Sequence, residues 1–242
     1  MNARAPATAP PGAAEPQPAP PERPLPPVPK TDAELIAGFN RLYYKGLSGR
    51  MPPFATHYWR GVRMLKCPMD VLIYQELVHY VRPDVIVETG VFHGGTTLFL
   101  ADLCEVRGHG LVVGVDIDIA TAAPIVREHP RTVLLQGSSV DPLIFENVRL
   151  LTEGKRVLVF LDSNHEEPHV AAELALYSTL VQPGGYLVVE DTNLPLVAPD
   201  AAPGPAAAVQ KFLAKHPEWQ PDLNSERGLV TFNPGGYLVR TG

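Results

Sequence analysis

The chain has 242 residues, 45% of them hydrophobic, and carries a formal net charge of −6 with an isoelectric point near 5.7. Its Lys and Arg residues are scattered along the sequence, which argues against nucleic acid or an anionic membrane as the main partner, because both require a clustered basic surface. Two cysteines (Cys67 and Cys104) make no disulfide framework, and we find neither a membrane-spanning apolar run nor a signal-type apolar core. We therefore expect a soluble, cytoplasmic protein.

Residues 1–30 differ in composition from the rest of the chain. They contain 11 of the 27 prolines, mixed with Ala, Gln and Glu. A segment of this kind has too little apolar surface to offset the entropy lost on folding. We therefore expect a disordered Pro/Ala-rich tail over residues 1–30 and a single folded domain over residues 31–242.

Two helices are predicted before the first strand. The segment 31–47 begins with Thr31 or Asp32 as a cap and spaces its apolar residues at helical intervals. A second amphipathic helix is predicted over 69–82, ending before Pro83. A minimal α/β fold does not need these helices, so the region of about 31–82 could form a lid or the interface of a homo-oligomer.

From residue 84 onward, apolar strands alternate with helices. Strands are predicted at 84–89, 111–116, 131–137, 156–162 and 185–191, with helices at 96–106, 120–128, 141–151 and 168–181 between them. A Pro/Ala/Gly-rich loop at about 194–205 precedes a last helix at 207–217, and two short strands at 228–232 and 236–240 flank the turn "NPGG". Continuous apolar strands, each followed by a helix, indicate a parallel sheet covered on both faces. The sequence therefore predicts a doubly wound α/β domain that ends in an antiparallel hairpin.

The first strand runs into a glycine-rich turn that is suited to binding a ligand. Glu88 lies at the strand tip, Gly90 in the turn, and Gly94 at the start of the next helix, where free N–H groups and a flexible backbone can approach a ligand. Glu88 would repel a pyrophosphate but attract a cation. Asp116, at the end of the second strand, occupies the position where a carboxylate binds ribose hydroxyls in dinucleotide folds. The alternative is that both acids only cap the turns that follow them.

Three further carboxylates end two later strands. Asp162 follows the strand "RVLVFL", and Glu190 and Asp191 follow "GYLVV". Carboxylates that converge without a counter-charge raise one another's pKa and destabilise the fold, and a hard divalent cation removes that cost. An all-oxygen ligand set suits Mg²⁺ better than Zn²⁺. Capping of the following turns by these acids remains the alternative.

A ligand with ribose, a positive charge and no pyrophosphate suggests S-adenosylmethionine (SAM). The chain resembles the cephalosporin hydroxylase/rhamnosyl O-methyltransferase family of class I SAM-dependent methyltransferases. The resemblance rests on six blocks in order over about residues 35–240, namely "YWRGVRMLKCPMD", "VETGVFHGGTTLFLA", "GVDID", "LDSNH", "PGGYLVVEDTN" and "LVTFNPGGYLVR". It implies a Rossmann-like sheet of seven strands and a SAM- and Mg²⁺-dependent O-methyltransferase. The implied acceptor is a hydroxyl of a small molecule, such as a rhamnosyl sugar of a natural product.

The resemblance also implies roles for individual residues. Asp162, Glu190 and Asp191 are the implied Mg²⁺ ligands, and Asp162 also borders the cofactor. His165, three residues after Asp162, is the predicted base that accepts the hydroxyl proton, although it could instead orient the metal ligands or be an ordinary loop residue. His93 could touch the methionine end of SAM, and Ser138 and Ser139 occupy the position of the adenine ring.

A zinc site, an iron-dependent hydroxylase and a non-catalytic SAM-binding protein are the other interpretations of this sequence. "HEEPHV" is not a zinc-binding helix motif, because Pro168 interrupts the helical spacing and instead fits the first turn of the next helix. An iron-dependent hydroxylase would need two histidines and one carboxylate on one face, whereas this motif offers three carboxylates and one nearby histidine. A non-catalytic SAM-binding accessory protein would keep the same binding residues, since such residues do not prove turnover.

Overall fold

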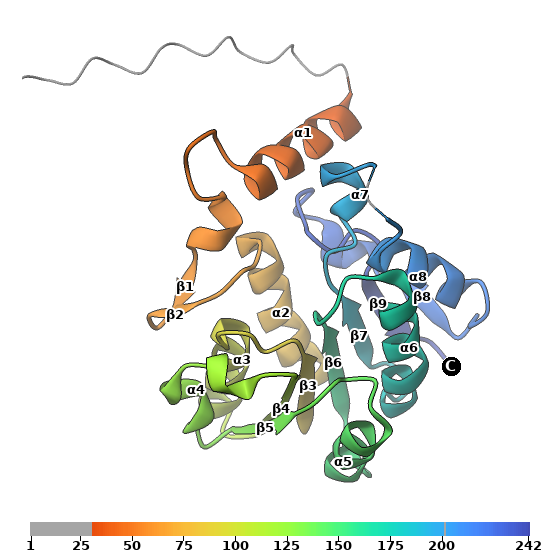
Figure 1. Cartoon of the computed structure of the whole chain (residues 1–242). Coiled ribbons are helices and arrows are strands. Elements are labelled where there is room, and N and C mark those ends of the chain that lie inside the picture. Colours follow the sequence, from red (N-terminus) through yellow and green to blue (C-terminus); the bar gives the residue numbers. More distant parts are fainter. Residues whose placement is uncertain (1–30, 201) are drawn as a thin grey trace, which may run out of the picture.

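The computed structural model describes residues 31–200 and 202–242, and the tail predicted over residues 1–30 lies outside this part. Its centre is a seven-stranded sheet in the order β5-β4-β3-β6-β7-β9-β8 (Figure 1). The strands are β3 (Val85–Thr89), β4 (Leu111–Asp116), β5 (Thr132–Gln136), β6 (Val157–Leu161), β7 (Tyr186–Val189), β8 (Trp219–Pro221) and β9 (Tyr237–Arg240). Strands β3 to β7 pair in parallel, and β9 runs antiparallel to β7 and β8. The predicted doubly wound α/β sheet is confirmed.

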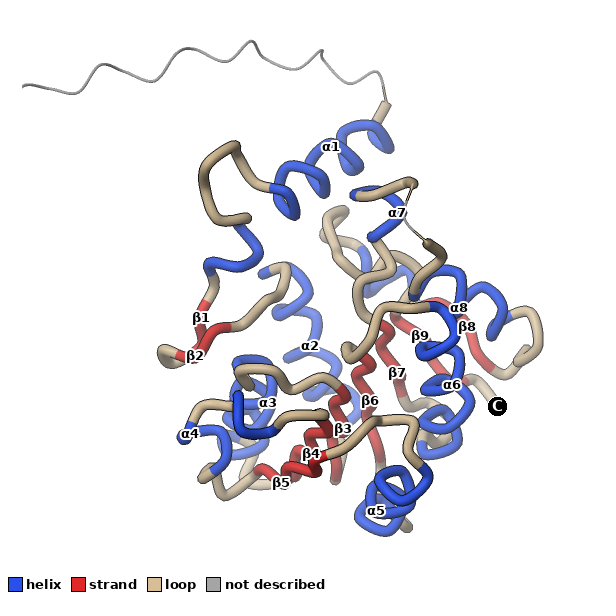
Figure 2. The backbone as a smooth tube through the Cα atoms, in the orientation of Figure 1, coloured by secondary structure: helices blue, strands red, loops and turns tan. Residues whose placement is uncertain are grey.

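Helices cover both faces of this sheet (Figure 2). One face is covered by α2 (Pro68–Val81) and α3 (Gly95–Val106), and the other by α5 (Pro142–Thr152), α6 (Glu167–Tyr177) and α8 (Pro205–Leu213). The remaining helical elements are α1 (Asp32–Lys45), α4 (Pro124–Arg127), α7 (Leu194–Val197) and the 3₁₀ turns η1 (Pro53–Thr56), η2 (Ile119–Thr121), η3 (Ser178–Leu180) and η4 (Leu223–Glu226). No helix in the described ranges is long and apolar enough to cross a membrane.

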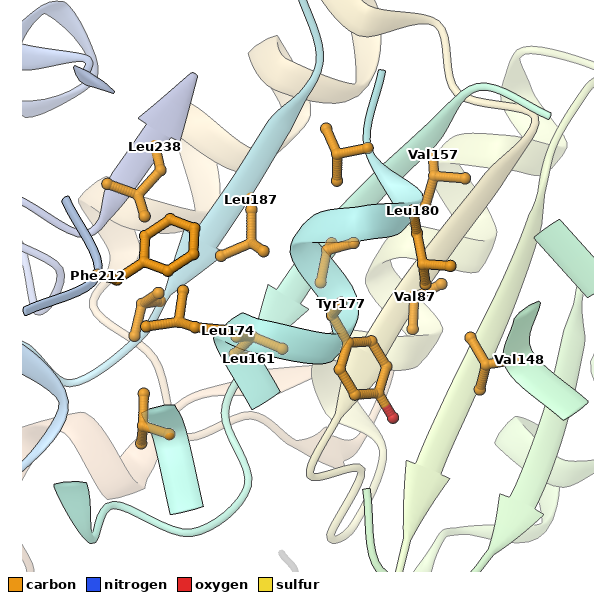
Figure 3. Close-up of a cluster of buried hydrophobic side chains, with 14 of the residues drawn as sticks. Val87, Val148, Val157, Leu161, Leu174, Tyr177, Leu180, Leu187, Phe212 and Leu238 are labelled. Carbon is orange, nitrogen blue, oxygen red and sulfur yellow. The ribbon is translucent and has the colours of Figure 1, made fainter. Parts of the chain in front are cut away.

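Alternate residues of each central strand feed two separate cores. In β6, Val157, Val159 and Leu161 pack with α5, α6 and α8, and part of this cluster is drawn in Figure 3. The intervening residues Leu158 and Phe160 pack with α2 and α3 on the opposite face. Because successive strand residues point to opposite faces, a strand buried on both sides must be a continuous apolar run, as the sequence predicted.

The predicted C-terminal antiparallel strand pair is confirmed, but the predicted position of its first strand is wrong. Residues 228–232 form no strand, and β9 pairs instead with β8, at 219–221, on the side away from β7. Hydrogen bonds to Asp70 of α2 hold this segment: the Thr231 hydroxyl and the Phe232 N–H (2.8 Å) both donate to its carboxylate. Leu229, with φ of +63°, also turns the chain away from extended geometry. The apolar pattern of residues 228–232 predicts a strand. It carries no information about the distant Asp70, which accepts the Phe232 N–H.

A short hairpin before α2 was also not predicted. Strands β1 (Tyr58–Trp59) and β2 (Val62–Arg63) pair antiparallel around Gly61. The hairpin packs on α3, where the Trp59 ring meets Phe99 edge-on at 5.0 Å and its Nε1 donates to Asp102 at 2.7 Å. The segment between the two N-terminal helices therefore has a fixed position beside the start of α3.

Asp70 is the centre of a buried polar network and provides a test of this packing. Its side chain, 1% exposed, also accepts a hydrogen bond from the Tyr237 hydroxyl at 2.7 Å. We expect Asp70→Ala to lower the free energy of unfolding by about 3 kcal/mol or more, because three buried donors lose their acceptor. Urea unfolding would measure this loss, with Glu153→Ala as an exposed control. A loss below about 1 kcal/mol would contradict the assignment.

Candidate active site

A cavity of about 810 Å³ lies at the carboxyl ends of the parallel strands. The sheet order changes direction at β3, which has β4 on one side and β6 on the other. In open α/β sheets this reversal is where ligands bind. Most of the predicted site residues line the cavity: Gly90, His93, Asp116, Ser138, Ser139, Asp162, His165 and Asp191. Glu88, Gly94 and Glu190 are not among the lining residues.

The glycines of the β3–α3 turn are required by close packing. Gly90 has φ of +86°, and a Cβ there would lie 1.9 Å from the carbonyl oxygen of Asp162. Gly94 has φ of +85° and would place a Cβ 2.8 Å from Val126. The first contact joins the ends of β3 and β6, so the absence of a side chain at Gly90 lets the acid of β6 lie beside the glycine-rich turn.

Asp116 and Ser139 line the cavity but also have partners within the protein. The two carboxylate oxygens of Asp116 accept the backbone N–H groups of Phe92 (2.8 Å) and Asp118 (2.9 Å). The Ser139 hydroxyl lies 3.0 Å from Nε2 of His169, which belongs to the first turn of α6. Both residues therefore combine a position on the cavity wall with a structural contact.

Glu88 lies beneath the cavity rather than in its wall. Its side chain is 1% exposed and accepts a short hydrogen bond from the hydroxyl of Thr97. Burial raises the pKa of Glu88 to about 7, against the opposing effect of the Thr97 bond. Glu88 therefore packs beneath the turn and does not face a ligand in the cavity.

Two acids and one histidine converge at the ends of β6 and β7. Ligand atoms of Asp162, His165 and Asp191 all lie within 4.8 Å of one another. The Nε2 atom of His165 is 3.2 Å from Oδ2 of Asp191 and 3.4 Å from Oδ1 of Asp162. Asp191 has φ of +56°, a left-handed conformation that is uncommon for non-glycine residues, and its N–H donates to Oδ1 of Asn233 at 3.2 Å. The backbone is thus held in the conformation that turns this carboxylate toward His165.

Lys66 is a residue of the site that was not predicted from the sequence. Its ammonium contacts the carboxylate of Asp162 and lies 2.8 Å from Oε2 of Glu190. Lys66 and Glu190 are both almost fully buried, and Oε1 of Glu190 has no hydrogen-bond partner among the described residues. Glu190, predicted as a metal ligand, therefore points one oxygen at Lys66. The only signal in the sequence was a lone cation in the apolar stretch "MLKCPM".

Mutual charge effects perturb the ionisation of this cluster. Burial alone would lower the pKa of His165, but its hydrogen bond to Asp162 and the charges of Asp191 and Asp162 raise it to about 9. Burial and the charge of Asp162 raise the pKa of Asp191 to about 6. Burial alone would lower the pKa of Lys66, but the two carboxylates that it contacts hold it well above its usual value. Three carboxylates surround one ammonium and one imidazole, so the ionisation of each group depends on that of the others.

An aromatic wall closes the cavity next to the acids. Tyr44 of α1 and Phe54 of η1 stack with ring centroids 4.6 Å apart, and Phe232 meets them edge-on at 5.6 and 6.0 Å. All three rings line the cavity. The nearby carboxylates of Asp191 and Asp162 add to burial in raising the pKa of Tyr44 to about 12. The N-terminal region and the segment before β9 thus form one side of the site.

Comparisons with known proteins identify relatives of this chain. The family model described as Rhamnosyl O-methyltransferase/CmcI matches residues 54–241. The chain is similar to the Rhamnosyl O-methyltransferase of Mycobacterium tuberculosis, with 32% identity over 206 residues that cover 82% of this chain and 83% of that protein. The Mycobacterium leprae Rhamnosyl O-methyltransferase is 33% identical over 193 residues, covering 76% and 83% of the two chains.

Solved structures support the same fold. A structure of CmcI with Mg and SAM aligns with a TM-score of 0.63 and 22% identity, covering 82% of this chain and 83% of that one. An apo structure of CmcI aligns with a TM-score of 0.62 and 23% identity over the same shares of the two chains. At these identities the likeness concerns the fold, which is a Rossmann-like methyltransferase fold.

Replacing Glu88 with Gln should change how stability depends on pH. The pKa of Glu88 is raised from 4.5 to about 7, so the folded state holds this proton more tightly than the unfolded state. The wild type therefore loses stability as pH rises through this window, by roughly 3 kcal/mol in total from this group. Gln remains neutral, so the variant should gain on the wild type between pH 5 and pH 8.

The measurement is the free energy of urea unfolding of both proteins at the two pH values. Glu153→Gln, an exposed substitution, serves as the matched control. An identical change with pH in the wild type and in Glu88→Gln would show that Glu88 ionises normally in the folded state.

Proposed function

The chain belongs to the Rhamnosyl O-methyltransferase/CmcI family and is a SAM-dependent O-methyltransferase, and we propose that its acceptor is a hydroxyl of a small-molecule sugar and that the reaction requires Mg²⁺. The observation that carries this proposal is the convergence of Asp162, His165 and Asp191 at the wall of a cavity that begins at the β3–α3 turn. Acids, a base and the cofactor-binding turn then meet in one cavity.

SAM would lie across the strand ends in the order of the sheet. Ser138 and Ser139 follow β5, Asp116 ends β4, and Gly90 follows β3. We assign the adenine ring to the first of these positions, the ribose hydroxyls to Asp116 and the methionine part to the turn at Gly90. The sulfonium would then approach the acids at the end of β6, whose negative charge favours a cation.

The donor set fits a divalent cation. Asp162 and Asp191 supply oxygen ligands, and the buried Oε1 of Glu190 without a partner is a further oxygen that a cation would satisfy. When bound, Mg²⁺ would neutralise the carboxylates and lower the pKa of an acceptor hydroxyl. The cluster contains one histidine beside two acids, which does not match the two-histidine, one-carboxylate pattern of an iron hydroxylase.

The protein's own residues would then position the acceptor and take its proton. Once the cation neutralises the carboxylates that hold the pKa of His165 at about 9, the imidazole would accept the hydroxyl proton as the oxygen attacks the methyl carbon, the S–CH₃ bond breaks, and S-adenosylhomocysteine leaves. The aromatic wall of Tyr44, Phe54 and Phe232 offers ring faces against which the apolar side of a sugar can pack. In this proposal the region of about 31–82 contributes the acceptor side of the site.

The cation assignment is tested by calorimetry. We expect Asp191→Asn to weaken Mg²⁺ binding at least about 10-fold, because a carboxylate ligand becomes a neutral amide. SAM binding should stay within a few-fold of wild type, and Asp118→Asn, an exposed acid near Asp116, should leave both affinities unchanged. Equal Mg²⁺ affinities of the wild type and Asp191→Asn would contradict the site.

The base assignment is tested with radiolabelled SAM and an aryl rhamnoside as acceptor. His165→Gln should lower the rate of methyl transfer by about 10² to 10⁴ while SAM affinity is retained, since the side chain takes the proton and does not hold the cofactor. The matched control is His109→Gln, because His109 is an exposed histidine that does not line the cavity. Full activity of His165→Gln would exclude the imidazole as the base.

A further inference from the structure

One cationic side chain in the cavity wall has no acidic partner. Arg63, at the end of β2, lines the cavity together with Lys66. Lys66 is bound by two carboxylates, whereas the guanidinium of Arg63 donates only to the carbonyl oxygen of Ala55 (3.2 Å) and to Sδ of Met51 (3.0 Å). Among the described residues, no carboxylate forms an ion pair with Arg63. A guanidinium bonded to one carbonyl and one weak sulfur acceptor retains donors for an anion.

The position of Arg63 is fixed beside the cofactor-binding turn. Its backbone carbonyl lies so close to Gly95 that a Cβ on that glycine would be 2.2 Å away. The β1–β2 hairpin is anchored to α3 by Arg60, which bonds Asp102 at 2.7 Å on the side away from the cavity. Arg63 therefore stands next to the start of α3, where Gly95 and Thr96 also line the cavity.

The charge distribution of the cavity restricts where an anionic ligand group can lie. Asp116 borders it at one strand end, and Asp162 and Asp191 border it at two others. A carboxylate placed near these acids would be repelled, and the ammonium of Lys66 is already neutralised. The methionine part of SAM carries a carboxylate that must enter this cavity. Arg63 and Lys66 are the two Arg or Lys side chains of the described chain that line it, and only Arg63 is not already paired with acids.

We propose that Arg63 is the anchor of the methionine carboxylate of SAM, through charge-assisted hydrogen bonds from its guanidinium. The proposal rests on the proposed function, since it places SAM with its methionine part at the β3–α3 turn. It directs the carboxylate toward β2 and the sulfonium toward the acids of β6 and β7. The N-terminal hairpin thereby takes part in cofactor binding, in addition to packing on α3.

The test compares two adenosine ligands that differ in the amino-acid part. S-adenosylhomocysteine carries the carboxylate, and 5′-methylthioadenosine lacks the whole amino-acid group. We expect Arg63→Gln to weaken binding of S-adenosylhomocysteine by about 10- to 100-fold, the effect of one charge-assisted bond pair, and to leave 5′-methylthioadenosine within about twofold. Arg63→Lys should lose less, because it keeps the charge but not the planar fork.

Controls separate this proposal from the proposed function and from misfolding. Arg60→Gln, in the same hairpin but bonded outside the cavity, should bind both ligands as the wild type does, and thermal unfolding should be similar for all variants. Unchanged S-adenosylhomocysteine binding in Arg63→Gln, or equal losses for both ligands, would overturn the carboxylate assignment. Failure of the wild type to bind either ligand would instead overturn the proposed function.

Discussion

The contact between the ammonium of Lys66 and the carboxylates of Asp162 and Glu190 is the interaction on which the rest of the site depends. The three groups come from the segment before α2 and from the ends of β6 and β7. Removing Lys66 would leave two acids without their counter-charge, which is strongly destabilising. This cation therefore allows two adjacent parallel strands to end in acids, and it ties the N-terminal region to the rim of the sheet.

A second layer of polar contacts sets the direction of the remaining acid. Asp191 adopts a left-handed backbone conformation, and Asn233 accepts its N–H. Asn233 in turn donates to the hydroxyl of Tyr74 on α2 at 2.8 Å, beside the network around Asp70. The left-handed conformation of Asp191 is thus held by a buried network that connects α2 with the segment before β9. Uncommon backbone conformations held by surrounding contacts are typical of functional sites, where the direction of a side chain matters.

The cavity divides into two parts with different chemistry. On the side of β3, β4 and β5 it is built from strand ends and glycine-rich turns, whose positions follow from the sheet itself. On the side of β6 and β7 it is completed by Tyr44, Phe54 and Phe232, which come from loops and from helices outside the sheet. The first part follows from the sheet, whereas the second depends on segments outside the sheet that tertiary contacts, such as the hydrogen bond from the Phe232 N–H to Asp70, hold in place.

Sequence alone determined the parallel sheet and the rim on which the acids lie. Apolar runs such as "VLVFL" report burial on both faces, and the residue after each run must lie at the carboxyl edge, so Asp116, Asp162 and Asp191 could be placed together. Lys66 could not be, because its partners lie 96 and 124 residues away in the chain. The local pattern predicts a strand at 228–232, and the hydrogen bonds from Thr231 and Phe232 to Asp70 that prevent it are equally non-local. Local patterns record which surfaces are buried, whereas the pairing of buried charges is decided only when distant segments meet in the folded chain.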